Sequence, residues 1–284
     1  MRSFFGDMWR ILRNDKGALV GAVIVVIYCV VAIIGPMVAH ISSTQNPAEA
    51  YLGPSWAHPL GTDALGQDIL AQIVIGTRPV MLVGFLAALM TVVTGVVIGL
   101  VSGYLGGFAD SAIMRVTDVA LTIPGLPLII VIATLIRTTN PFVLAVVLSV
   151  TGWAGLARAV RSQALSLRTM DFIEAARLQG MSLGNMVGRQ LLPNVGPYVA
   201  INFVLNVTGA IYAEVGLFVL GIVPISGVNW GEMINQAMSQ GALYTSNAVL
   251  YLFSPMAAIV ILQVGFVFFS RALDSLFNPA LRVQ

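Results

Sequence analysis

The chain has 284 residues, of which 58% are apolar and only 9% are charged. A soluble domain has roughly a quarter of its residues charged, so this composition excludes a water-soluble enzyme or binding domain. The net charge is only +2, and a single cysteine, Cys29, excludes both an internal disulfide and a metal cluster built on thiolates.

Long uncharged stretches dominate the sequence. About 18 to 20 such residues cross the roughly 30 Å of a bilayer core as a helix, and these stretches lack the two-residue alternation of barrel strands. We predict six spans, at about 18–39, 79–102, 119–136, 141–157, 197–222 and 250–270. The first apolar run is too long for a cleavable signal peptide, so we expect it to be retained.

The basic residues predict the orientation of the chain. An even number of spans puts both termini on one side, together with twelve of the 14 Lys and Arg residues. Only Arg78 and Arg137 fall on the other side, and cytoplasmic segments carry the excess of positive charge. We therefore predict cytoplasmic termini, with residues 1–17 as a cytoplasmic segment and residues 18–284 as one transmembrane domain.

Two longer segments are expected on the outer side, 41–78 and 223–249, besides a short turn at 137–140. The first contains several prolines and glycines, which break regular structure. Apolar residues then recur from Leu65 to Ile75 and predict a short amphipathic helix over 63–76, lying on the membrane surface.

The longest inner segment predicts two short helices joined by a glycine turn. Asp171 is placed to cap the first helix with Glu174 at its third position, and Gly180 is expected to end it. Ser182 begins a second helix with an apolar stripe, which Pro193 is expected to close. A simple pore has no need for such an ordered pair.

The same inner segment contains a sequence motif that is similar to one in a known family. Glu174-Ala175-Ala176, then Gly180, then Leu192-Pro193 resemble the EAA loop, about 166–194 here, of bacterial ABC importer permeases. The resemblance implies a coupling helix that docks on a nucleotide-binding subunit, with small alanines for close approach, Gly180 for the turn and Glu174 for a polar contact. The residues alone leave open that Glu174 only caps its helix or pairs with Arg177.

Further motifs narrow the resemblance over nearly the whole chain. They are Asn14-Asp15-Lys16-Gly17-Ala18, His58-Pro59-Leu60-Gly61-Thr62-Asp63 through Asp68, Gly103-Tyr104-Leu105-Gly106-Gly107, Asn229-Trp230-Gly231 and Asn278-Pro279-Ala280-Leu281-Arg282. Together they resemble the shorter permease subunit of dipeptide, oligopeptide and nickel importers. The implied architecture is all-α, with the six transmembrane helices of the type I ABC importer permease (MetI-like) fold.

The resemblance also implies a location and partners. These are the bacterial or archaeal inner membrane, a second permease subunit, two ATP-binding subunits and an extracytoplasmic substrate-binding protein. No phosphate-binding loop of the GxxxxGK[ST] type occurs, so we expect no cofactor and no catalysis here, with ATP and Mg²⁺ bound by the partners. The substrates implied are di- or oligopeptides, with oligosaccharides or nickel complexes as alternatives.

Three polar residues within the fifth span are pathway candidates. An ionisable group inside a membrane is costly and suggests function, which singles out Glu214, although an interhelical hydrogen bond explains it equally well. Asn202 and Asn206 share one helix face and either line a pathway or hold helices together. A competing class, an ion-coupled secondary transporter, expects inverted repeats and several midplane charges. Glu214 is the only carboxylate well inside a span.

Overall fold

The computed structural model describes residues 15–41, 46–224, 227–244 and 248–277. The motif at 278–282 and most of the segment 1–17 therefore lie outside the described residues. Within them the chain is helical, apart from turns, the loop at 50–68 and one isolated bridge in it between Thr62 and Asp68. This confirms the all-α prediction. The main helices are α2 (Lys16–Val38), α3 (Ile69–Leu105), α4 (Gly107–Thr122), α5 (Gly125–Ile136), α6 (Pro141–Arg168), α7 (Asp171–Leu178), α9 (Leu192–Val219), α10 (Trp230–Ser239) and α11 (Val249–Phe277).

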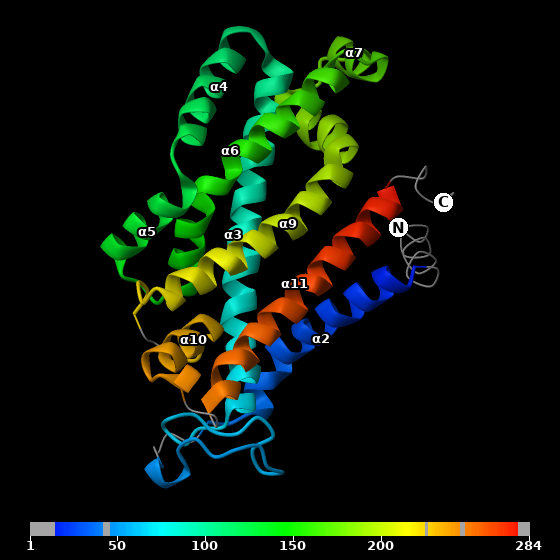
Figure 1. Ribbon diagram of the computed structural model, residues 1–284. Coiled ribbons are helices and arrows are strands. Elements are labelled where there is room, and N and C mark those ends of the chain that lie inside the picture. The colour runs from blue at the N-terminus through cyan, green and yellow to red at the C-terminus, as the bar shows by residue number, and fades with distance from the viewer. Residues whose placement is uncertain (1–14, 42–45, 225–226, 245–247, 278–284) are drawn as a thin grey trace.

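The helices form an elongated bundle with different structures at its two ends (Figure 1). Helix α7 lies at one end, in the half that also holds the start of α2 and the end of α11. Helix α10 and the loop that precedes α3 lie at the opposite end. By length and composition, five described helices could cross a membrane, or six if α4 and α5 count as one broken span.

A seam of glycines joins α3 closely to α6. Gly95, Gly99 and Gly103 follow one another at four-residue spacing on the same face of α3. A Cβ on Gly99 would lie 2.5 Å from the carbonyl oxygen of Ala157, and one on Gly103 would lie 2.6 Å from Cβ of Ala164. Small residues at this spacing let helix backbones approach within a membrane.

The predicted third span, 119–136, is broken. Helices α4 and α5 meet at a bend of 82°, because Ile123 is extended and Pro124 follows it; a residue before proline disfavours the helical conformation. The segment 103–118, between the predicted second and third spans, is mostly helical as well. Gly106 and Gly107, with φ of 64° and 58°, turn the chain directly from α3 into α4.

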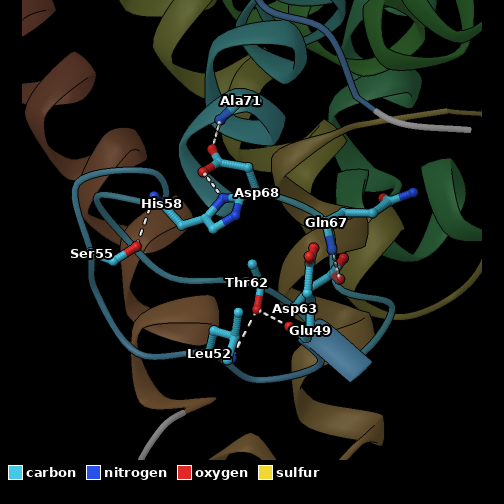
Figure 2. Close-up of polar contacts among 9 residues, drawn as sticks. All are labelled: Glu49, Leu52, Ser55, His58, Thr62, Asp63, Gln67, Asp68 and Ala71. Carbon is cyan, nitrogen blue, oxygen red and sulfur yellow. Dashed lines mark hydrogen bonds and ion pairs between the residues drawn. The ribbon is translucent and has the colours of Figure 1, made fainter. Parts of the chain in front are cut away.

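The predicted second span, 79–102, is also too short, and the surface helix expected over 63–76 does not form as a separate element. Helix α3 runs without interruption from Ile69 and contains Pro79. The Asp68 side chain caps it, since Oδ1 accepts from the amide of Ala71 at 2.7 Å and Oδ2 lies 2.9 Å from Nδ1 of His58 (Figure 2).

Asp63 organises the loop before α3. Its buried carboxylate accepts the amides of Leu65 and Gln67, each at 2.8 Å, and the side-chain amide of Gln72 at 2.7 Å. Thr62, also buried, accepts the amide of Leu52 and donates to the carbonyl of Glu49. The motif from His58 to Asp68 therefore builds a rigid start for α3 (Figure 2).

Pro193 does not close a short helix as expected. Ser182 precedes a helical run from Leu183 to Val219, formed by α8 (Leu183–Asn185), a π-helical segment η2 (Met186–Leu191) and α9. Proline lacks the amide that an α-helix needs at its interior, but Pro193 stands in the first turn of α9, directly after the wider π turn. The helical rod therefore continues through it.

Helix α6 extends well beyond the expected 141–157 and reaches Arg168. Its C-terminal half carries ion pairs to α4. Asp118, which is spaced for a pair with Arg115 on its own helix, instead pairs with Arg158 of α6. Ion pairs thus hold this half of α6 against α4, while the glycine seam holds it against α3.

We expect Gly99→Ala to lower the free energy of unfolding by about 1–3 kcal/mol, the usual penalty of overpacking. The added methyl group meets a backbone carbonyl, which cannot move aside without separating α3 from α6. Denaturant unfolding of the full chain in detergent micelles would measure this. Gly155→Ala on α6 is the matched control, because no atom lies within 4 Å of its Cβ position. Equal stability of the two variants would contradict the seam.

Asp68→Ala should destabilise the full chain by about 1 kcal/mol, the typical cost of losing an N-cap. Asp68→Asn should remain close to the wild type, because asparagine caps as well as aspartate. Thermal unfolding of both variants in micelles separates two roles of this side chain. If Asn is as harmful as Ala, the ion pair with His58 matters more than the cap.

Candidate functional site

The inward face of α7 is anchored in the bundle. Ile173 is fully buried and Ala176 nearly so, and both belong to an apolar cluster with Met186 and Leu191 of η2. The guanidinium of Arg177 lies over the ring of Tyr104 at the end of α3, 5.6 Å from its centroid. The pairing of Arg177 with Glu174, one of the alternatives that the residues left open, is not among the ion pairs of the described residues. Helix α7 is thus fixed to both α3 and the start of α9.

The outward face of α7 has no partner within the described chain. Glu174 and Ala175 are exposed, and Leu178 is 83% exposed. An isolated exposed leucine needs no explanation, but Phe172 and Leu183 are exposed in the same segment. The end of the bundle at α7 therefore exposes three large apolar side chains together with the carboxylates of Asp171 and Glu174. Sequence reasoning located this segment but did not single out Leu178.

The turn after α7 forms as expected at Gly180, which has a φ of 73°. The amide of Met181 donates to the carbonyl of Ala176 at 3.2 Å, and that of Gly180 donates to Arg177 at 3.0 Å. These two hydrogen bonds are the Schellman pattern, which favours glycine at this position.

The capping box expected at Asp171 is wrong. The N-cap is Met170, in an extended conformation and without a side-chain hydrogen bond, and Asp171 is the first helical residue. The turn that follows α6 determines this boundary, because it places Met170 rather than Asp171 at the point where the chain enters the helix. The Asp171 carboxylate still lies in the first turn, where a negative charge is favourable.

Asn206 lines a cavity of about 300 Å³ between α3, α5, α6 and α9. Thr91 and Thr151 add hydroxyl groups to its otherwise apolar wall. The Asn206 amide donates to the carbonyl of Asn202 at 2.8 Å, and its Oδ1 lies 3.3 Å from the Cβ position of Gly152. The side-chain oxygen is therefore directed across to α6.

Asn202, expected to act beside Asn206, is not among the residues that line this cavity. Its amide donates to the carbonyl of Tyr198 at 2.9 Å within α9. Both asparagine side chains therefore bond to a carbonyl four residues earlier on α9, but only Asn206 also lines the cavity.

Glu214 lies completely buried near the end of α9 that is remote from α7. Its Oε1 accepts from the side chain of Asn229 at 2.9 Å, and Oδ1 of Asn229 in turn caps α10 through the amide of Gly231 at 2.8 Å. One of the two readings of Glu214, an interhelical hydrogen bond, is therefore observed. Its second oxygen, Oε2, has no hydrogen-bond partner within the described residues.

Helix α10 was not anticipated within the expected outer loop at 223–249. Trp230, fully buried, donates to the carbonyl of Ile73 at 3.0 Å and meets the ring of Tyr28 edge-on, with centroids 5.9 Å apart. Asn235 donates to the carbonyl of Val219 at 2.7 Å. These contacts join α10 to α2, α3 and α9, so it closes the bundle at the end opposite α7 (Figure 1).

Sequence reasoning also missed a partly buried ion pair at the α7 end. Arg161 of α6 binds Asp110 of α4 with two parallel hydrogen bonds, of 2.5 and 2.6 Å. Ser102 of α3 donates to the same carboxylate. A two-pronged arginine–carboxylate contact fixes geometry as well as adding energy, so three helices are joined beside α7.

Comparisons with known proteins match this architecture. Residues 95–283 match the family model described as the binding-protein-dependent transport system inner membrane component. Residues 3–54 match the N-terminal transmembrane domain of oligopeptide transport permease C.

Curated relatives align with nearly the whole chain. The chain is 34% identical to the dipeptide transport system permease protein DppC of Bacillus subtilis (strain 168), over 99% of this chain and 87% of that protein. It is 30% identical to the oligopeptide transport system permease protein OppC of the same strain, over 99% and 91%. A putative peptide permease protein of Brucella suis biovar 1 (strain 1330) is 34% identical over 80% of this chain and 74% of its own.

The family match covers well over half of the chain and includes α4 to α11, the part that contains α7, Asn206 and Glu214. The N-terminal match adds α2. Together with full-length identity above 30%, these findings establish the class of the protein. The chain belongs to the family of binding-protein-dependent transport system inner membrane components, the permease subunits of ABC importers.

Proposed function

We propose that this permease takes up di- or oligopeptides, which a separate binding protein delivers, through a pathway that it forms with a second permease subunit. The curated relatives that cover nearly all of the chain are named for dipeptide and oligopeptide transport. Oligosaccharides and nickel complexes remain the alternative cargoes. The Asn206 cavity, with Thr91 and Thr151, is the candidate for the pathway within this subunit.

The observation that carries the rest of the proposal is the unpartnered outer face of α7. It places Glu174, Ala175 and Leu178 at the tip of the bundle, while its inner face is held rigidly. Two ATP-binding subunits dock on this face and on its counterpart in the second permease, and they hydrolyse ATP. Movement imposed on α7 passes into the continuous helical run that begins at Leu183.

The distribution of arginines supports an orientation in the inner membrane. The C-terminal half of α6 and helix α7 carry four of them, Arg158, Arg161, Arg168 and Arg177, whereas Arg78 and Arg137 belong to the opposite end of the bundle. Positive charge marks the cytoplasmic side, so α7, the start of α2 and the end of α11 face the cytoplasm. Helix α10 and the loop of Figure 2 then face the binding protein.

Proteoliposomes that contain this chain, its partner permease, both ATP-binding subunits and the binding protein should accumulate a labelled tripeptide only with ATP. The isolated chain should show no uptake, because the driving force comes from the partners. Uptake by the isolated chain under an ion gradient would instead support a secondary transporter. Uptake of an oligosaccharide or a nickel complex in place of the tripeptide would reassign the cargo.

In the same complex, Glu174→Lys and Leu178→Ser should each reduce substrate-stimulated ATP hydrolysis by about tenfold or more, the effect of losing one central interface side chain. For Leu178→Ser, insertion and assembly of the complex, measured by co-purification of its subunits, should fall less than substrate-stimulated ATP hydrolysis. Gly184→Ala is the control, since it lies in the same exposed segment with no atom within 4 Å of its Cβ position. Full stimulation in both variants would contradict the docking role of α7.

A further inference from the structure

A second cavity, of about 390 Å³, lies at the α10 end of the bundle, between α3, α6, α9 and α10. It is distinct from the Asn206 cavity, and its volume falls near the lower end of the roughly 300–1,000 Å³ typical of small-molecule sites. Three charged side chains line it, from three different helices: Arg78, Glu214 and Glu232. Such convergence of charge within a membrane bundle calls for a function.

Glu214 supplies the strongest indication of a ligand. The side chain is fully buried, and Asn229 satisfies Oε1, yet Oε2 has no donor in the described part of the chain. Buried polar atoms almost always have a partner. Close by, Pro79 has no N–H to give the carbonyl of Ile75, and both residues line the same cavity. The cavity wall thus contains two acceptor oxygens, Oε2 of Glu214 and the carbonyl of Ile75, that a donor group of a guest could satisfy.

Glu232 adds a second carboxylate to the wall. It is 5% exposed, and its Oε1 accepts from Gln236 at 2.9 Å. Burial raises the pKa of Glu232 to about 7, against the lowering effect of that hydrogen bond. A bound cation would therefore favour the ionised form.

Arg78 provides the opposite charge. It is exposed on α3 and forms no ion pair with any residue that the structure describes. Its guanidinium offers donors for a carbonyl or carboxylate oxygen of a guest. Arg78, Glu214 and Glu232 thus present one guanidinium and two carboxyl groups to a guest in this cavity.

We propose that this cavity is a subsite for the free amino terminus of the transported peptide, whose ammonium group donates to Oε2 of Glu214 and to Glu232. The apolar walls from Pro36, Val83 and Phe218 accept the side chain of the first residue. Arg78 binds an oxygen of the same peptide. A bare metal ion or a water molecule would not need the apolar wall formed by Pro36, Val83 and Phe218. The inference rests on the proposed peptide substrate.

Disulfide trapping in the complete reconstituted importer, with an added mild oxidant to take up the two electrons that disulfide formation releases, tests this directly. The only native cysteine of the chain, Cys29, is replaced by serine, reactive cysteines of the partners are removed, and Val228→Cys places a thiol in the cavity wall. The probes are Cys-Ala-Ala and Ala-Ala-Cys, both with free termini, supplied with the binding protein and ATP. Mass spectrometry of the permease chain measures the trapped fraction.

We expect Cys-Ala-Ala to be trapped at least about tenfold more than Ala-Ala-Cys, as charge-assisted hydrogen bonds to one terminus imply. N-acetylation of the probe and Glu214→Gln, which keeps an acceptor for Asn229, should each remove this preference. Glu49→Gln, a carboxylate of the outer loop that does not line the cavity, should retain it. A thiol at Tyr244, exposed outside the cavity, should show no preference.

Thr139→Cys, on the α6 side of the cavity, repeats the test if Val228→Cys impairs assembly. Equal trapping of the two probes in a complex that still accumulates tripeptide would overturn the subsite, and so would a preference that survives Glu214→Gln. A wild-type complex that takes up no peptide would overturn the proposed function itself, so the two failures are distinct.

Discussion

The close contact between α3 and α6 is the constraint on which the rest of the bundle depends. Three glycines bring the backbones so near that an added methyl group would collide with Ala157 or Ala164. Within lipid, apolar side chains gain little by leaving one apolar surface for another, so such packing must supply the association. Because α6 continues directly toward α7, the seam also determines where α7 stands.

Polar contacts secure the two ends of this apolar centre. At one end the carboxylate of Asp110 receives Arg161 and Ser102 from two other helices. At the other end Glu214 holds Asn229, the cap of α10. Asp110 and Glu214 are both buried, and a buried carboxylate is costly without its partners, so each of them restricts its neighbours to one arrangement. The ends are thus specified by few side chains.

A single helical run connects these ends. It begins at Leu183, just after the glycine turn of α7, passes through the π segment and reaches Val219, so that Asn206 and Glu214 lie on the same rod. A displacement of α7 therefore has a direct route to both cavities. π segments are frequent at functional positions in helices, and this one lies where the rod leaves α7.

The sequence by itself determined the membrane class, the helical architecture, the glycine turn at Gly180 and the resemblance that the family match confirmed. These depend on composition and on residues near one another in the chain. The broken span at Pro124, the early start of α3 and the continuity through Pro193 could not be read in this way, because a proline ends, bends or joins a helix according to the turns around it. The pairing of Asp118 with Arg158 and the packing of α10 against α3 became visible only in the tertiary structure. The same is true of the cavity that Arg78, Glu214 and Glu232 line together. Such contacts join residues far apart in sequence, and no local pattern records which helices will meet.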